Sequence, residues 1–200
     1  MPYYHGMSHA LKDRIALRAL RDAPHEGWTM DALRRAAENE GQKAQMAAAL
    51  FTGMDDAARH ISALFDRMMM EQLVSIDTEN MKVRERIACA VRTRLDIMAP
   101  YRDCLRVSMA HWARPMRSVR AAKTLWRSAD QIWTWAGDTA TDYNHYTKRA
   151  LLSGVMASTL LYWFQDTSPA NAGTRQFLDR RITNVLSVGK VIGTLRKKAA

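Results

Sequence analysis

The stretch DYNHYTKR, residues 142–149, gathers several reactive side-chain types within eight positions. It holds one acid, one amide, one imidazole, two phenols and two bases. An acid and an imidazole can transfer protons in catalysis, whereas aromatic and arginine side chains can anchor a protein partner. The uncharged segment ALLSGVMASTLLYWF, residues 150–164, follows directly. The cluster is therefore expected at the head of an apolar helix, as a catalytic site, a docking surface or an ordinary helix start.

Catalytic signatures are missing from the rest of the sequence. It contains no HExxH, CxxC, GxSxG or Gly-rich phosphate loop, and no Glu-x-x-His pair of the kind that di-iron bundles use. His60 and His111 lie among apolar residues, where we expect hydrogen-bonded structural histidines. Cys104 lies between Arg102 and Arg106, which could activate its thiol, but a buried inert thiol is the preferred interpretation. We therefore expect no enzyme, no cofactor and no metal site.

The composition predicts an all-α protein. Ala, Leu, Arg and Met dominate, Pro is scarce, and the 48% apolar fraction suffices for a hydrophobic core. Two cysteines, Cys89 and Cys104, without a secretion signal are typical of reduced thiols. The uncharged run at 150–164 is shorter than the roughly 20 residues that span a bilayer. It is expected to be a buried helix.

Apolar residues at three- and four-residue spacing predict the helices. Three short ones are expected at 11–22, 30–41 and 42–51. Thr29 is expected to be an N-cap and Gly41 to end the second helix, which gives helix-turn-helix spacing. Longer helices are expected at 55–76, 82–98, 103–113, 118–137 and 142–164, with a last one after residue 174. We expect an all-α chain with a helix-turn-helix-like region at 1–54 and a larger helical bundle at 55–200.

The charge distribution disfavours DNA binding. The net charge of +10 is made of −3 over residues 1–81, +8 over 82–130 and +5 over 131–200. DNA affinity comes largely from cations on phosphates, and sequence is read by polar side chains of the recognition helix. That helix would offer Gln42, Lys43 and Gln45 before a run of apolar residues. No nucleic-acid partner is expected, and a transcriptional regulator sensing a hydrophobic ligand remains the alternative function.

Methionine is abundant, with 13 residues, and six tryptophans accompany it. Flexible thioethers suit adaptable apolar pockets, although they also fill ordinary cores. We expect an elongated apolar cavity lined by Phe65, Met68, Met69, Leu95, Met98, Met109, Trp112, Met156 and Leu160.

The segments IWTWAGDTATDYNHYTKRALLSGVMASTLLYWFQDTSP and TRQFLDRRITNV resemble the ubiquinone-biosynthesis lipid-binding family of the ninth Coq protein and its alphaproteobacterial relatives. The resemblance is specific over about residues 131–186. It implies a TetR-type fold without DNA binding, a pocket for an isoprenoid lipid or quinone intermediate, and a homodimer. It also implies a non-enzymatic accessory role for the demethoxyubiquinone hydroxylase.

The resemblance implies a partner-docking patch formed by Asp142, Asn144, His145, Tyr146 and Arg149. On a helix, all of these except Asn144 share one face. The opposite set, Tyr143, Thr147, Ala150 and Gly154, is then expected to face inward. His145 departs from the family pattern, in which a tryptophan is frequent at this position.

The basic excess suggests a membrane surface with anionic lipids as a further partner, with a solvated face as the alternative. It resides in Arg84, Arg86, Arg92, Arg94, Arg102, Arg106, Arg114, Arg117 and Arg120. The sequence shows neither the presequence nor the extra C-terminal amphipathic helix of eukaryotic members. We therefore expect a bacterial, cytoplasmic protein that associates peripherally with the inner membrane.

Overall fold

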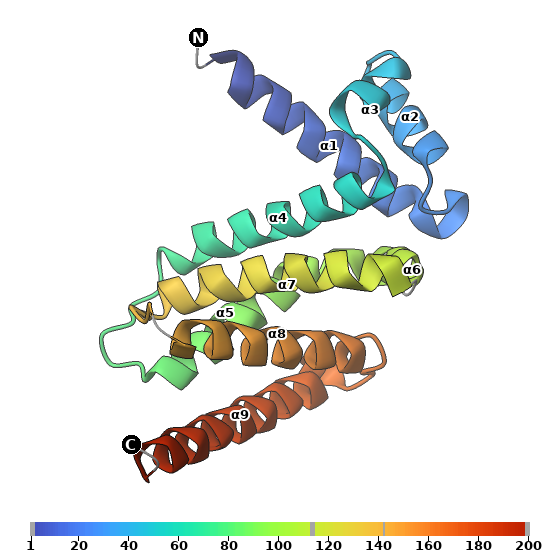
Figure 1. Ribbon diagram of the computed structural model, residues 1–200. Helices are drawn as coiled ribbons and strands as arrows, with labels where there is room; N and C mark the ends of the chain where they lie inside the picture. Colours follow the sequence, from blue (N-terminus) through green and yellow to red (C-terminus); the bar gives the residue numbers. More distant parts are fainter. Residues whose placement is uncertain (1–2, 113–114, 142, 199–200) are drawn as a thin grey trace. The chain divides into compact units, whose positions relative to one another are not determined.

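The computed structural model describes the backbone of residues 3–112, 115–141 and 143–198, and side chains within residues 9–185. All regular structure in these ranges is helical, as the composition predicts. The helices are α1 (Tyr3–Glu26), α2 (Met30–Asn39), α3 (Gln45–Leu50), α4 (Met54–Leu73), α5 (Val83–Met98), α6 (Arg102–Trp112), α7 (Pro115–Trp135), α8 (Tyr143–Trp163) and α9 (Ala172–Lys198) (Figure 1). Two short 3-10 turns, η1 (Ala99–Tyr101) and η2 (Pro169–Asn171), precede α6 and α9.

By packing, the chain divides into two compact units, which we describe separately. The first unit comprises residues 1–68 and 97–124, and the second comprises residues 69–96 and 125–200. Both units therefore draw on α4, α5 and α7. The division of roles at residue 54 that the sequence suggests stays a prediction.

In the first unit, α1, α2 and α3 form the expected helix-turn-helix arrangement (Figure 1). Thr29 is an extended N-cap whose Oγ1 accepts a hydrogen bond from the Ala32 amide at 3.2 Å. Gly41 follows α2 with a φ of +73°, a left-handed conformation that glycine adopts without steric cost. Both predictions at this helix are confirmed. The recognition-helix position, α3, is only six residues long, shorter than expected.

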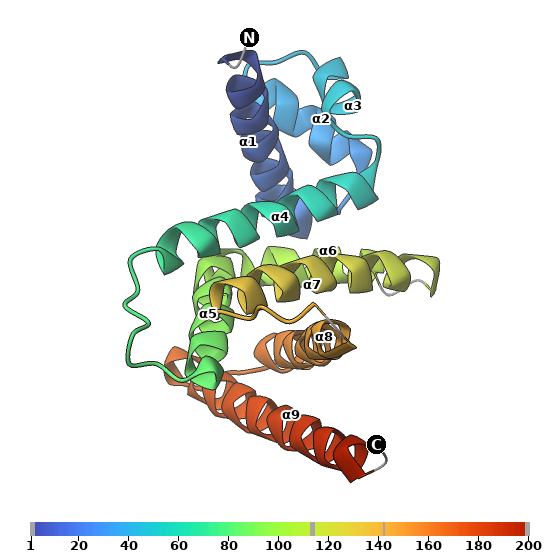
Figure 2. The same cartoon turned by 60° about the vertical axis from the view of Figure 1, so that its left-hand side comes forward.

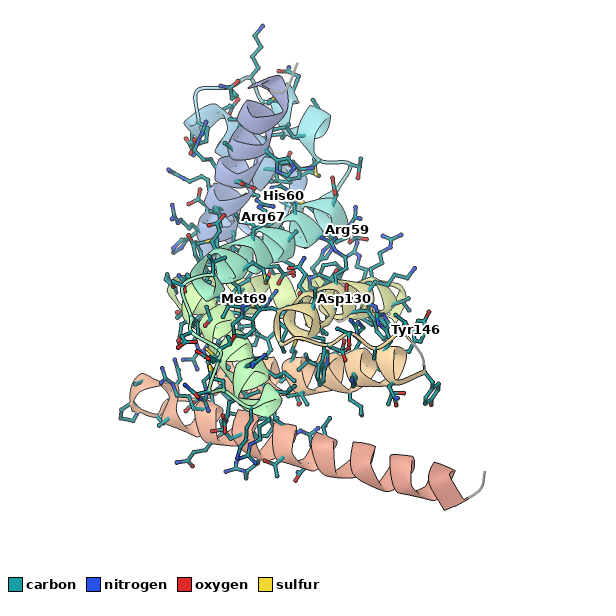
Figure 3. All side chains as sticks on the ribbon, turned by 90° about the vertical axis from the view of Figure 1, so that its left-hand side faces the viewer. Arg59, His60, Arg67, Met69, Asp130 and Tyr146 are labelled. Atoms are coloured by element: carbon teal, nitrogen blue, oxygen red, sulfur yellow. The ribbon has the colours of Figure 1, made fainter. Side chains whose placement is uncertain are left out.

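Partly buried ionic contacts tie α1 to α4 in the first unit. His60 Nε2 lies 2.7 Å from Asp13 Oδ1, and Arg67 donates to both oxygens of the same carboxylate. Figure 3 shows His60 and Arg67 on α4. Burial lowers the pKa of His60, against the opposing effect of Asp13. His111 likewise lies 2.5 Å from Asp55 Oδ1. Both histidines are thus hydrogen-bonded structural residues, as predicted.

Cys89 and Cys104 are both free thiols, as the sequence indicates. Burial raises the pKa of the Cys104 thiol, which keeps it protonated at neutral pH. This agrees with the expectation of an inert thiol despite the neighbouring arginines.

In the second unit, α8 packs along α9 (Figure 2). The buried residues of α8 recur at three- and four-residue spacing, as Leu152, Val155, Met156, Thr159 and Trp163. This spacing places them on one helical face. Among the described residues, no helix has the length and apolarity needed to cross a bilayer.

The turn between α8 and α9 is closed by Asp166, which is 8% exposed. Its Oδ1 accepts from the Ser168 amide at 2.9 Å and hydroxyl at 2.6 Å, and its Oδ2 accepts from the Thr174 amide at 2.7 Å and hydroxyl at 2.6 Å. Gly173 lies so close that a Cβ there would meet Tyr162 Oη at 3.0 Å and Asp166 Oδ1 at 3.2 Å. The segment DTSP, residues 166–169, is therefore a helix cap that fixes the start of α9 on the end of α8.

Candidate functional site

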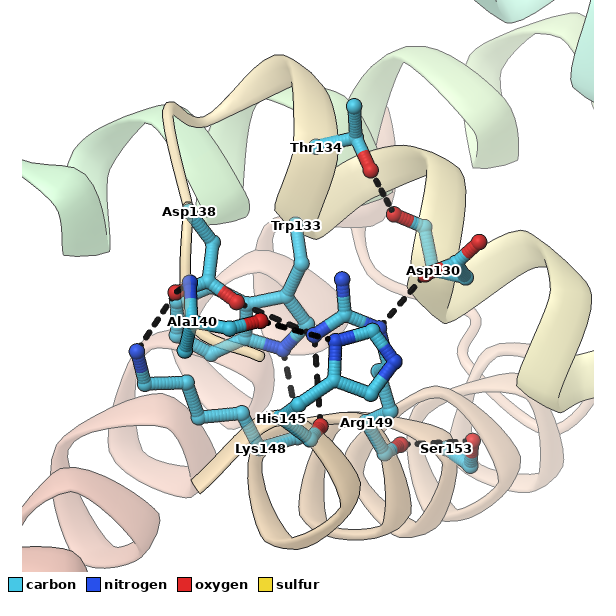
Figure 4. A network of polar contacts seen from close by, with 9 residues as sticks. All are labelled: Asp130, Trp133, Thr134, Asp138, Ala140, His145, Lys148, Arg149 and Ser153. Carbon is cyan, nitrogen blue, oxygen red and sulfur yellow. Dashed lines mark hydrogen bonds and ion pairs between the residues drawn. The ribbon is translucent and has the colours of Figure 1, made fainter. Parts of the chain in front are cut away.

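The cluster at the head of α8 is organised by Arg149, which is 2% exposed. Its Nε donates to Asp130 Oδ1 at 2.5 Å, and its Nη1 donates to Asp138 Oδ2 at 2.9 Å (Figure 4). Asp130 lies on α7, and Asp138 lies in the connection between α7 and α8. The guanidinium therefore ties three segments of the second unit together.

We call the contacts of Arg149 with Asp130 and Asp138 the Arg149 latch. Three neighbouring residues add further contacts to it. Lys148 Nζ donates to Asp138 Oδ1 at 2.5 Å and lies 5.4 Å from the centre of the Trp133 ring. Trp133 Nε1 donates to the backbone oxygen of Lys148 at 3.0 Å. His145 Nδ1 donates to the backbone oxygen of Ala140 at 3.0 Å (Figure 4). The connection between α7 and α8 is thereby held against the first turns of α8.

The electrostatics of the latch favour ionised Asp138, whose side chain is 4% exposed. Burial by itself raises the pKa of this carboxyl, but the hydrogen bonds from Lys148 and Arg149 outweigh it and lower the pKa below its usual value. Two cations thus compensate the buried carboxylate, as a buried charge requires. The arrangement is well suited to holding a helix start rigidly.

Part of the α8 face that we expected to be exposed is buried in the structure. Arg149 faces inward with Leu152 and Met156, so its predicted place on an exposed docking surface is wrong. The opposite set is not inward either, because Tyr143 is 61% exposed and Ala150 and Gly154 are exposed. The helix is rotated in this way because Asp130 and Asp138 neutralise the inward guanidinium.

The other residues of the predicted patch differ in how far they are exposed to solvent. Tyr146 is 63% exposed and projects from the start of α8 (Figure 3), with its ring 6.3 Å from that of Trp126. Asn144 is exposed and His145 is half-buried. Asp142 lies outside the described residues. Tyr143 and Tyr146 are therefore the large side chains that this end of α8 offers to a partner.

The nine predicted lipid-lining residues are distributed over both units. Phe65, Met68, Met98, Met109 and Trp112 belong to the first unit, and Met69, Leu95, Met156 and Leu160 belong to the second. Five of them are buried, namely Phe65, Met69, Leu95, Met98 and Met156, and the others are half-buried. Their joint lining of one lipid cavity stays a prediction.

The nine arginines have varied surroundings. Arg94 is 7% exposed, and Arg86 donates to the backbone oxygens of Thr78, Met81 and Ala136. Arg117 and Arg120 contact the Asp55 carboxylate. Arg92 contacts Asp179, Arg84 and Arg106 are exposed, Arg102 is half-buried, and Arg114 lies outside the residues with described side chains. Several of these arginines therefore form ion pairs or hydrogen bonds within the protein. A lipid surface would contact fewer than nine of them.

The sequence did not indicate that Asp130 and Asp138 are the partners of Arg149. The available signal was the AGD motif at residues 136–138, which places an acid directly after α7. Its partner Arg149 lies 11 positions later on α8, and no helical periodicity connects the two residues.

The fold of the described residues is that of TetR-type regulators. The crystal structure of the TetR transcriptional regulator from Nitrosomonas europaea matches it with a TM-score of 0.70, covering 88% of this chain and 98% of that chain. The two sequences are 20% identical, so the likeness shows the fold alone.

The chain is similar to proteins of the COQ9 family. Residues 119–189 match the COQ9 family model. The mitochondrial ubiquinone biosynthesis protein COQ9 is 30% identical over 193 residues in Rattus norvegicus, 32% over 197 in Bos taurus and 30% over 195 in Homo sapiens. Each match covers 90% of this chain but 60%, 58% and 58%, respectively, of the relative. The chain thus spans about three fifths of the length of these relatives.

Proposed function

We propose that this protein is a non-enzymatic accessory protein of ubiquinone biosynthesis. It binds an isoprenoid lipid or quinone intermediate in its helical bundle and presents it to the demethoxyubiquinone hydroxylase. The relatives named as ubiquinone biosynthesis proteins support the pathway. The observation that carries the docking role is the pair of exposed tyrosines, Tyr143 and Tyr146, on a helix start held rigid by the Arg149 latch.

The docking role predicts that Tyr146→Ala loses the hydroxylase. A large aromatic side chain that is 63% exposed can supply a binding hot spot, whose truncation costs about 2 kcal/mol or more, roughly a thirtyfold loss of affinity. Folding should change little, because the side chain is mostly in water. Co-purification of the hydroxylase and the melting temperature are the measurements.

A matched control for Tyr146→Ala is Val74→Ala, since Val74 is 85% exposed and lies outside α8. It should change neither measurement. Full recovery of the hydroxylase with Tyr146→Ala would refute the docking role, and so would a loss that occurs only together with unfolding.

The lipid role predicts a specific effect of Met156→Trp. Met156 is 5% exposed on the inner face of α8. In a filled core, the larger side chain overpacks and destabilises by about 1–3 kcal/mol. In a lipid cavity it occupies space used by the ligand, so native mass spectrometry should show less bound lipid with an almost unchanged melting temperature. A lower melting temperature, with no lipid on the unmodified protein, would contradict the proposal.

The outer face of α8 supports a homodimer. Ala150, Gly154 and Leu161 are exposed, Leu161 by 56%, and residues 150–164 carry no charge. An uncharged exposed face of this kind fits a second copy better than solvent. Light scattering should give twice the chain mass, and Leu161→Glu should shift the protein to the monomer. A monomeric unmodified protein would contradict this part of the proposal.

Peripheral contact with anionic lipids of the inner membrane is part of the proposal, because Arg84 and Arg106 remain exposed. Vesicles rich in cardiolipin should bind the protein more strongly than zwitterionic vesicles. Equal recovery from both would exclude an electrostatic contact.

The alternative function, a transcriptional regulator, has weaker support despite the fold. The exposed side chains of α3 are Gln45, Ala48 and Ala49, which offer one polar group for reading bases. Sequence-selective binding of duplex DNA at physiological salt would favour the regulator over the accessory protein.

A further inference from the structure

His111, a histidine of the first unit, contacts a different helix through each of its ring nitrogens. Its Nε2 lies 2.5 Å from Asp55 Oδ1 of α4, and its Nδ1 lies 3.0 Å from Arg117 Nη1 of α7. His111 itself lies in the last turn of α6, and its side chain is 10% exposed. All three residues belong to the first unit. Contacts from a carboxylate through an imidazole to a guanidinium thus connect α4, α6 and α7.

The two partners determine which ring nitrogen of His111 carries the proton. A guanidinium can only donate hydrogen bonds, so Nδ1 accepts from Arg117 and carries no proton. The proton of the neutral ring is therefore on Nε2, which donates to the Asp55 carboxylate. In this arrangement the imidazole is uncharged.

The carboxylate of this cluster stays ionised over the range in which imidazoles titrate. Burial by itself raises the pKa of Asp55, but the hydrogen bonds from His111 and Arg120 outweigh it, so the pKa lies below its usual value. The guanidinium groups of Arg117 and Arg120 keep their charge in proteins. Of these four side chains, the His111 ring is therefore the one whose charge can change between about pH 8 and pH 5.

A second proton on His111 would bind at Nδ1, where it would face the N–H group of Arg117. Two donors cannot form a hydrogen bond with each other, so the contact at Nδ1 would break. Another acceptor is close, because Arg117 Nε lies 3.4 Å from Asp55 Oδ1. Arg117 Nη1 also lies 3.5 Å from the backbone oxygen of His111 in the last turn of α6. This contact requires the same position of the guanidinium, so it would be lost with the first.

We propose that His111 is an acid-sensitive switch that controls how Arg117 of α7 is attached to the end of α6. At neutral pH the uncharged imidazole holds the guanidinium at the last turn of α6. When the ring gains a second proton, Arg117 leaves Nδ1 and pairs with Asp55 instead. A cation near the C-terminal end stabilises a helix, so the end of α6 is then less stable. None of the exposed tyrosines takes part, so the switch is independent of the proposed docking role.

NMR spectroscopy of the full chain between about pH 8 and pH 5 tests the switch. At the alkaline end, long-range spectra of the imidazole nitrogens should show the His111 proton on Nε2. As the ring gains its second proton, the Nε–H resonance of Arg117 should shift with the same midpoint. Amide exchange in the last turn of α6 should become about tenfold faster than the intrinsic pH dependence of exchange predicts, the factor that corresponds to one hydrogen bond to a charged group.

His111→Gln is the matched variant that cannot switch. Its amide oxygen can accept from Arg117 and its amide N–H can donate to Asp55, but the side chain does not titrate. The Arg117 resonance and the amide exchange at the end of α6 should then show no acid response. The control is His25→Gln, which removes an exposed histidine of α1 and should respond to acid as the unmodified protein does.

Arg117→Met provides a second test that does not depend on His111→Gln. Without the guanidinium, amide exchange at the end of α6 should be fast already at neutral pH and should not respond to the ring. Arg127→Met, which removes an exposed arginine of the same helix, should behave as the unmodified protein does. The proposal is overturned if His111 carries its proton on Nδ1 at neutral pH, if the Arg117 resonance does not follow the ring, or if His111→Gln still responds to acid.

Discussion

Replacing Arg149 by methionine is expected to lower the free energy of unfolding by about 3–5 kcal/mol, the usual cost of removing one partner from a buried ion pair. Asp138, with a side chain 4% exposed, would keep only Lys148 as a cation, and Asp130 would lose its contact at 2.5 Å. Most of the lost stability comes from leaving the buried Asp138 carboxylate without its guanidinium partner. Urea denaturation at pH 7 measures it.

Two further variants test this origin. Arg180→Met removes an exposed arginine of α9 and should change stability by no more than about 0.5 kcal/mol. The double variant Asp138→Asn with Arg149→Met should recover part of the loss, because the uncompensated charge is gone. A loss below about 1 kcal/mol for Arg149→Met alone would mean that the latch is not stabilising.

Variants of the latch also distinguish a loss of stability from a loss of the proposed docking. Arg149→Met should reduce recovery of the hydroxylase only as far as it unfolds the head of α8, so recovery and melting temperature should fall together. Tyr146→Ala should lower recovery alone. Arg149→Glu should be more damaging than Arg149→Met, since it places a third carboxylate between Asp130 and Asp138.

Replacing Asp166 by asparagine is the second change with a large expected effect, about 3 kcal/mol of destabilisation at pH 7. The carboxylate accepts four hydrogen bonds, two from Ser168 and two from Thr174. An amide has one acceptor oxygen and turns its own N–H groups toward the remaining donors. The start of α9 would thereby lose its fixed position on the end of α8. Thermal and urea unfolding measure the effect.

The pH dependence of this difference has a defined sign. The hydrogen bonds from Ser168 and Thr174 hold the pKa of Asp166 far below its usual range. A depressed pKa contributes stability above the unfolded-state pKa of about 3.9, and this contribution is lost as the pH falls below that value toward the folded-state pKa. The gap between the unmodified protein and Asp166→Asn should therefore be constant near neutral pH and shrink below about pH 4.

The control for Asp166→Asn is Asp103→Asn, because Asp103 is 83% exposed on α6. It should leave stability nearly unchanged at every pH. If the gap between Asp166→Asn and the unmodified protein widened with acidification, the carboxylate would not be the group that the four donors stabilise.

Local sequence patterns determined much of this protein. Apolar spacing, Thr29 as an N-cap and Gly41 after α2 were sufficient to predict helices and a helix-turn-helix, because these features act over one or two helical turns. Contiguous segments within residues 131–186 were sufficient to show a resemblance to the COQ9 family, whose model matches residues 119–189. The sequence also predicted hydrogen-bonded histidines, because a histidine on an apolar stripe needs a partner.

Tertiary structure alone decided how α8 is rotated. The pattern of residues 142–154 permits two orientations of α8. The charge of Arg149 by itself favours the orientation in which this side chain faces solvent. Asp130 and Asp138, supplied by α7 and the following connection, make the buried guanidinium stable and turn Tyr143 outward instead. Charge compensation between segments distant in the chain depends on where the folded helices place their charges, and no local spacing records it.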